Sequence, residues 1–185
     1  MSLDKLTSQL NQSTQKTDKK LPPIESWNPP YCGEINIEIK TNGDWFHEGT
    51  AFKRMKLVKL FSSVLWREVT EDKDEYFLVT PVEKIKIRVE DSPFVLTQWH
   101  WQDETKQTMV LSTNLDDEFI LDKEHPISLN EQGELYVLVR RNLLAKVHRN
   151  VYYQWVDLAQ EVTQGDVTEL VLNSAGEQFV LGSFA

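Results

Sequence analysis

Short stretches of alternating apolar and polar residues constrain this fold more than any other feature of the sequence. In one of them, Ile35, Ile37 and Ile39 alternate with polar residues, which is the period of a strand with one buried face. Asn42-Gly43 follows and favours a tight hairpin turn, because both residues tolerate positive φ values. We expect further strands at residues 44–50, 76–80, 85–89, 94–101, 108–113, 119–121, 127–129, 151–156, 169–173 and 178–181.

Two segments have the apolar spacing of an amphipathic helix instead. The first contains Leu57, Phe61 and Leu65, and the second spans residues 134–148 around Val139 and Leu143. The apolar positions of the two helices match at a constant offset, which suggests an internal duplication. Antiparallel strands with one helix in each half predict an α+β fold rather than a wound parallel sheet.

The charge balance excludes several classes of partner. The chain has 185 residues, with 29 Asp and Glu against 20 Lys and Arg, and a formal net charge of −9. Such an acidic chain repels phosphate backbones, so we expect no nucleic acid as partner. Apolar runs are far shorter than the ~20 residues that cross a bilayer, so we expect no membrane insertion. Cys32 is the one cysteine, which fits a reducing compartment, and we expect a cytoplasmic protein.

Composition changes divide the chain into three parts. Residues 1–21 are rich in Ser, Thr and Gln, and we expect a flexible tail there, with a docked or partner-binding helix as the alternative. A proline-rich strap follows and begins an N-terminal α+β subdomain at residues 22–93, and a C-terminal α+β subdomain takes residues 94–185. The strap is expected to pack Trp27 onto the body, although it also resembles a ligand of proline-binding modules.

Recognisable catalytic motifs are absent from the sequence. The seven glycines are too dispersed for a phosphate-binding loop, and no nucleophile elbow or zinc-binding helix motif occurs. The polar cluster at residues 114–125 favours a solvated loop over a metal site, so we expect no metal ion and no cofactor.

Two basic residues have less ordinary surroundings. Arg140 borders an apolar stripe and therefore needs a carboxylate, a backbone carbonyl or an anionic ligand; a structural ion pair is the favoured reading. Lys84 follows Pro81 and Glu83 at a break between two strands. Such a junction either pins a turn or lines a cleft.

With these residues in view, the chain resembles the Domain of Unknown Function 1285 family, a proteobacterial family of unknown function. The resemblance covers about Pro22 to Gly182 and departs from the family pattern at Ala51-Phe52, where a Pro-Ile pair is usual. The matching residues are Trp27-x-Pro29, Cys32-Gly33, Gly43-x-Trp45, Gly49, Arg54, Leu57-Val58-x-Leu60-Phe61-x-x-Val64-Leu65, Leu78–Lys84, Val89-Glu90-Asp91-x-Pro93-Phe94, Thr113-Asn114, His125-Pro126, Val139-Arg140 and Val151-Tyr152-Tyr153.

The resemblance implies a duplicated α+β architecture whose second half superficially resembles pleckstrin-homology domains. It also implies binding of a small, nucleotide-like ligand where the two halves meet, and a role in signal transduction. Fold similarity by itself licenses no activity.

Our leading hypothesis is a non-enzymatic cytoplasmic sensor that binds an anionic metabolite or nucleotide between its two halves. The expected ligand-binding residues come from both halves of the chain: Arg54, Glu83, Lys84, Asp91, Asn114, His125 and Arg140. One alternative is a metal-dependent phosphoester hydrolase using Asp91, Asp117 and His125. The other is a scaffold without a small-molecule site, in which the proline strap, the tryptophans and the basic tail contact another protein. Separately, exposed edge strands favour a homodimer.

Overall fold

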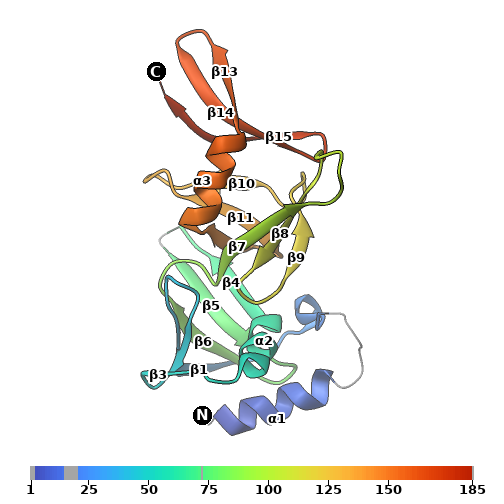
Figure 1. The fold of residues 1–185 in the computed structure, drawn as a ribbon. Helices are drawn as coiled ribbons and strands as arrows, with labels where there is room; N and C mark the ends of the chain where they lie inside the picture. The colour runs from blue at the N-terminus through green and yellow to red at the C-terminus, as the bar shows by residue number, and fades with distance from the viewer. Residues whose placement is uncertain (1–2, 15–20, 72, 185) are drawn as a thin grey trace. The chain divides into compact units, whose positions relative to one another are not determined.

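A computed structural model of the chain describes residues 3–14, 21–71 and 73–184 (Figure 1). The chain divides into two compact units, Met1–Glu90 and Asp91–Ala185, and each is treated by itself below. Within the described residues, no helix is both long and apolar enough to cross a membrane.

The first unit contains one six-stranded sheet and two helices. Its elements are α1 (Leu3–Thr14), the 3-10 turn η1 (Ile24–Ser26), β1 (Tyr31–Ile39), β2 (Trp45–His47), β3 (Thr50–Ala51), α2 (Met55–Ser63), β4 (Leu65–Val69), β5 (Asp74–Val79) and β6 (Lys84–Val89). The strand order is β3-β2-β1-β6-β5-β4. Neighbouring strands are antiparallel except β1 and β6, which pair in parallel.

The first hairpin forms as the sequence predicts. Ile35, Ile37 and Ile39 are all buried on one face of β1, while Asn42 and Gly43 make the turn into β2. Gly43 has a φ of 85°, a conformation that glycine adopts at little steric cost. The predicted strand at residues 44–50 is broken in two, because a turn with Glu48 at positive φ separates β2 from β3.

The sequence predicted one of the two helices of this unit, whereas a flexible tail was expected in place of the other. The predicted amphipathic helix is confirmed as α2, which buries Val58 and Phe61, but it ends at Ser63 and Leu65 begins β4 instead. Residues 3–14 differ from the flexible tail that was expected, because they form α1 with Leu6 and Leu10 fully buried. Two leucines one turn apart supply too little surface for an isolated helix, but they suffice for a helix that docks. Residues 15–20 lie outside the described part of the chain.

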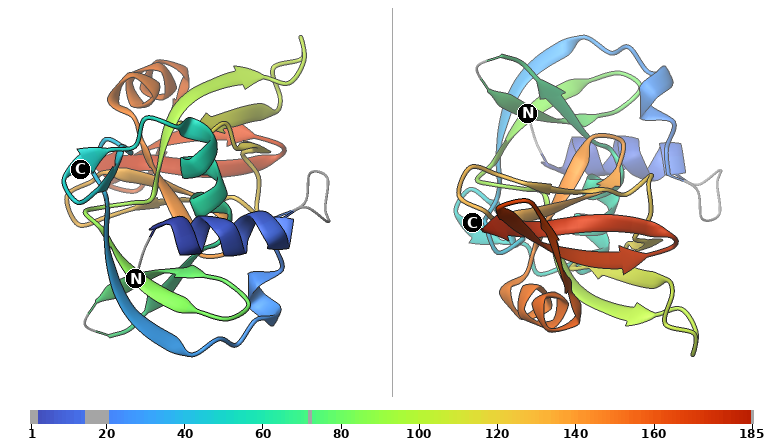
Figure 2. Two further views of the ribbon diagram at one scale, coloured as in Figure 1. Left: turned by 90° about the horizontal axis from the view of Figure 1, so that it is seen from below. Right: turned by 90° about the horizontal axis from the view of Figure 1, so that it is seen from above.

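The second unit contains another six-stranded sheet, one helix and a three-stranded sheet. Its elements are β7 (Phe94–Trp101), β8 (Met109–Thr113), β9 (Glu118–Ile120), β10 (Ile127–Leu129), β11 (Leu135–Arg140), β12 (Leu143–Val147), α3 (Arg149–Leu158), β13 (Gln160–Gln164), β14 (Val167–Ser174) and β15 (Glu177–Phe184). The sheet orders are β10-β11-β12-β7-β8-β9 and β13-β14-β15. Figure 2 shows the small sheet in red and orange at the C-terminal end.

The predicted order of elements is wrong between residues 134 and 158. Residues 134–148 form the hairpin β11–β12 rather than a helix, and residues 151–156 belong to α3 rather than to a strand. Several apolar residues of this segment, namely Tyr136, Val137, Val139 and Val147, are aromatic or β-branched, which suits a strand. Arg141 adopts a φ of 54° and turns the chain between the two strands.

The internal duplication is confirmed, but in a different register from the one expected. In each unit the first strand pairs in parallel with the sixth, β1 with β6 and β7 with β12, and antiparallel strands continue the sheet on both sides. The matched helices of the sequence analysis do not correspond, because α2 lies between the third and fourth strands whereas α3 follows the sixth.

Candidate functional site

A pocket of about 540 Å³ lies beside the beginning of α2 in the first unit. Its volume falls within the range of ~300–1,000 Å³ that is usual for small-molecule sites. Three parts of the unit supply its walls, namely α1, α2 and the segment that leads from β2 through β3 into α2. The lining residues are Leu3, Thr7, His47, Thr50, Ala51, Phe52, Lys53, Arg54, Lys56, Leu57 and Leu60. In the left view of Figure 2, α1 crosses beside α2.

The apolar floor of this pocket is held by a row of aromatic contacts. Phe52 meets the buried Phe61 edge to face at 5.9 Å between ring centroids, and Phe61 stacks on Trp45 at 6.5 Å. His47 lies at 6.2 Å from Phe52 on the other side. Phe52 and His47 themselves line the pocket, so these ring contacts support part of its wall.

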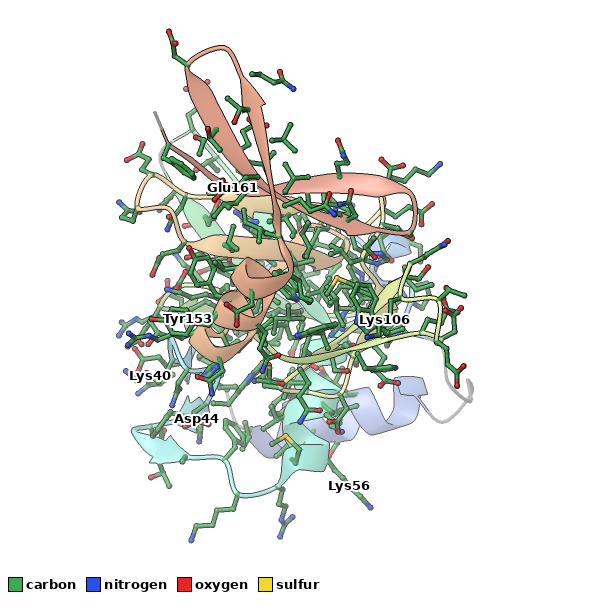
Figure 3. The ribbon with its side chains drawn as sticks, turned by 45° about the horizontal axis from the view of Figure 1, so that its top comes forward. Lys40, Asp44, Lys56, Lys106, Tyr153 and Glu161 are labelled. Atoms are coloured by element: carbon green, nitrogen blue, oxygen red, sulfur yellow. The ribbon has the colours of Figure 1, made fainter. Side chains whose placement is uncertain are left out.

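Basic side chains surround the N-terminal end of α2. Lys53, Arg54 and Lys56 are all exposed, and Figure 3 shows Lys56 extending away from the ribbon. Arg54 occupies the N-cap position, and within the described residues no side chain caps this helix and no acidic residue lies in its first turn. No ion pair joins Arg54 to another described residue. A helix N-terminus is electropositive, so three further cations here favour a negatively charged ligand.

Glu83 and Lys84 lie elsewhere in the first unit and have structural roles. The N–H of Glu83 donates to the Thr80 hydroxyl oxygen at 3.0 Å, while the N–H of Thr80 donates to the Glu83 carbonyl at 2.8 Å. The ammonium of Lys84 pairs with Glu68 and lies 4.2 Å from the centre of the Phe77 ring. The junction therefore pins a turn, and Lys84 also borders a separate pocket of about 210 Å³.

Asp91 belongs to a polar network in the second unit. Its carboxylate accepts a hydrogen bond from the Tyr136 hydroxyl at 2.7 Å and another from the Lys146 ammonium at 2.8 Å. Burial and the hydrogen bond to Asp91 raise the pKa of Tyr136. Burial works to lower the pKa of Lys146, but hydrogen bonds to Asp91 and Glu134 raise it overall. The hydroxyl of Tyr136 and the ammonium of Lys146 therefore both donate to the carboxylate of Asp91 within the second unit.

Arg140 and Asn114 are also engaged within the second unit. Arg140 forms an ion pair with Asp117, as the favoured reading of the sequence had it, and lies over the Phe94 ring at 4.6 Å. The Asn114 side-chain oxygen accepts the N–H of Val95 at 2.9 Å, which joins the loop after β8 to β7. Both contacts join parts of the second unit around its six-stranded sheet and therefore have a structural role.

His125 packs against Phe119 with ring centroids 4.7 Å apart, and its Nδ1 lies 3.2 Å from the Asp122 carboxylate. Burial works to raise the pKa of Asp122, but hydrogen bonds from the N–H of Glu124 and from the His125 ring lower it overall. Asp91, Asp117 and His125 thus have three different sets of partners. No three His, Cys, Asp or Glu side chains in the described ranges form a group that could hold a metal ion.

Of the seven predicted residues, Arg54 is the one that lines the pocket beside α2. Sequence reasoning missed its neighbours His47, Lys53 and Lys56. Lys53 and Lys56 had a readable signal, because a basic run directly before an amphipathic helix is unusual in so acidic a chain.

Comparison with known proteins identifies relatives without a described activity. A structure of a DUF1285 family protein from Silicibacter pomeroyi DSS-3 has a TM-score of 0.73 at 32% identity, covering 93% of both chains. Another, from Shewanella baltica OS155, has a TM-score of 0.52 at 29% identity and covers 66% of this chain and 91% of its own. No curated protein matches.

The family domains account for most of the sequence. Residues 22–92 match the N-terminal domain of the domain of unknown function DUF1285, and residues 93–181 match the C-terminal domain of the DUF1285 proteins of unknown function. The two matches meet close to the division between the compact units. The chain therefore belongs to the DUF1285 family.

Proposed function

We propose that this chain is a non-enzymatic binding module for a small anionic ligand, held in the pocket beside α2. One observation carries the proposal: Lys53, Arg54 and Lys56 gather with His47 at one pocket of a chain whose formal net charge is −9. Like charges repel one another, so such a group in an acidic protein is better explained by an anion than by folding.

Each basic group suits a different part of an anion. The guanidinium of Arg54 presents a planar fork that matches a carboxylate or phosphate, whereas the two lysines act as flexible point charges. The uncapped N-terminus of α2 adds backbone N–H groups to the same place. A nucleotide, a cytoplasmic location and a role in signalling remain predictions, as do the binding roles of the other six residues.

A thermal-shift screen tests the proposal on the full chain. The panel contains inorganic phosphate, nucleoside phosphates and carboxylates, and a ligand present at a hundredfold excess over its Kd stabilises the folded state by about 2.7 kcal/mol. We expect calorimetry to show at least tenfold weaker binding by Arg54→Ala. Lys123→Ala, which removes an exposed lysine of the second unit, is the control and should bind normally. Equal affinity of Arg54→Ala and the unmodified chain would refute this site.

A further inference from the structure

We infer that the ligand is an anionic amphiphile, a carboxylate that carries a linear acyl chain. This inference rests on the proposed function and adds the chemical class of the ligand. It comes from the way in which the lining divides into a basic end and an apolar end.

The basic end fits a carboxylate head group. Lys53, Arg54 and Lys56 are consecutive or nearly so in sequence and lie at the N-terminal end of α2. Arg54 therefore meets the two carboxylate oxygens with its fork, while the lysines neutralise the remaining charge. All three side chains are exposed, so the head group stays close to water.

The apolar end fits a hydrocarbon chain. Leu57 and Leu60 line the pocket from α2, Leu3 lines it from α1, and Phe52 lines it from the segment that precedes α2. These half-buried side chains gain from removal of water by any apolar group that covers them. An acyl chain that runs from Arg54 towards Leu3 would cover them all.

A nucleobase suits the same surface less well. Besides Lys53, Arg54 and Lys56, the polar side chains of the lining are Thr7, Thr50 and His47. The hydroxyl of Thr7 already donates to the Leu3 carbonyl at 2.8 Å, and the other two residues lie together at the β2–β3 turn. A base placed between the leucines would lose its hydrogen bonds to water without replacing them, which is costly.

The position of α1 gives the inference a second readout. Leu6 and Leu10 anchor this helix, and Gln9 accepts a hydrogen bond from the Thr80 hydroxyl at 3.4 Å. Leu3 and Thr7 meanwhile form part of the pocket wall. A bound acyl chain contacts both helices, so it must slow proteolysis within α1, whereas an anion without a tail contacts the α2 end alone.

Isothermal titration calorimetry with butyrate, hexanoate, octanoate and decanoate, all kept below micellar concentrations, tests the inference. We expect binding to tighten about fourfold for each additional buried methylene. Arg54→Glu should weaken every member of the series, and Leu60→Gln should flatten the dependence on chain length. Lys123→Glu is the matched charge-reversal control, and circular dichroism verifies that each variant folds.

Other results overturn the inference in distinguishable ways. Affinity that depends on Arg54 but is equal for all chain lengths, or is higher for a nucleotide, rejects the acyl chain and keeps the anion site. Decanoate binding that neither variant alters is non-specific adsorption and rejects the inference. Sedimentation with phosphatidylglycerol vesicles without binding of free decanoate assigns the basic end to a lipid surface instead. Failure of every anion to bind removes both the inference and the proposed function.

Discussion

The two units share a sheet topology but differ in where they place a helix and in how they treat their basic residues. In the first unit α2 interrupts the strand sequence and begins without a side-chain cap, whereas α3 follows the last strand and is capped by His148, whose Nδ1 accepts the N–H of Asn150 at 3.2 Å. Arg140 in the second unit is paired with Asp117, whereas Arg54 in the first unit is exposed at the pocket.

This difference concerns local stability at the helix ends and around the basic residues. A capped helix end and paired charges are consistent with local stability in the second unit. Cations gathered at an uncapped helix N-terminus conflict with the helix dipole and so cost stability. Features that lower local stability, such as cations at the N-terminus of a helix, are expected at functional sites. The comparison therefore supports the proposed site in the first unit, and substitutions there test it.

Removal of the largest buried aromatic residue from each helix tests whether the two helices anchor their units equally. Phe61 on α2 and Trp155 on α3 are both fully buried. We expect Phe61→Ala and Trp155→Ala each to lower the free energy of unfolding by about 3–5 kcal/mol, because each leaves a large cavity. Urea denaturation followed by circular dichroism measures both losses. A loss below about 1 kcal/mol for either variant would show that its helix is not a structural anchor.

The contrast between the two arginines predicts a smaller and more specific effect. Arg140→Met leaves the carboxylate of Asp117 without its partner and should cost about 2 kcal/mol, less than for a fully buried pair because Asp117 retains some contact with water. Arg54→Met should change stability by no more than about 0.5 kcal/mol. The double variant Arg140→Met with Asp117→Asn should recover part of the loss, and unchanged stability of Arg140→Met would contradict the structural role.

The strands show how far the sequence determines this fold. Alternation around Ile37 and the Asn42-Gly43 turn depend on neighbours in the chain, so the first hairpin was predictable. Residues 134–148 satisfy both helical and strand periods, and the pairing of β12 with the distant β7 decides between them. The docked helix α1 was the alternative to the favoured flexible tail, because its two leucines form a stable helix only where they are buried, and the local sequence does not show that burial.

The candidate site was also predictable only in part, because some of its residues are neighbours in sequence whereas the partners of the other predicted residues are not. Arg54 was named from the sequence, and Lys53 and Lys56 stand beside it in the basic run. The partners of Arg140 and Asp91 lie many positions away, at Asp117 and Lys146, and a linear pattern does not show which distant carboxylate meets which cation. Their engagement in ion pairs became visible only in the folded chain.

Acid should weaken both units through carboxylates whose pKa is lowered by folding. Hydrogen bonds from Lys73 and Lys86 lower the pKa of Glu75 to about 2, and Lys146 followed by Asn130 lowers that of Glu134. A folded state with the lower pKa binds fewer protons than the unfolded state, so this stability is present above about pH 4.5 and is lost as the pH falls towards 2.

Urea midpoints measured across this range provide the test. Glu75→Gln should reduce the decline with acid more than Glu134→Gln, because the pKa of Glu75 is the more strongly lowered. If Glu75→Gln leaves the decline between pH 5 and pH 2 unchanged, the ion pairs on β5 do not contribute to stability in solution.

The smallest expected effect is also the one that most sharply separates stability from function. Lys56 lies in the first turn of α2, where a negative charge interacts favourably with the helix dipole and a positive charge does not. Lys56→Glu should therefore raise the free energy of unfolding by about 0.5 kcal/mol while it weakens anion binding. Lys123→Glu makes the same charge change at a residue that does not line the pocket and should do neither. A substitution that stabilises the empty protein and impairs binding is expected only if the cations at α2 are maintained for a ligand, so a loss of stability in Lys56→Glu would instead make Lys56 part of the fold.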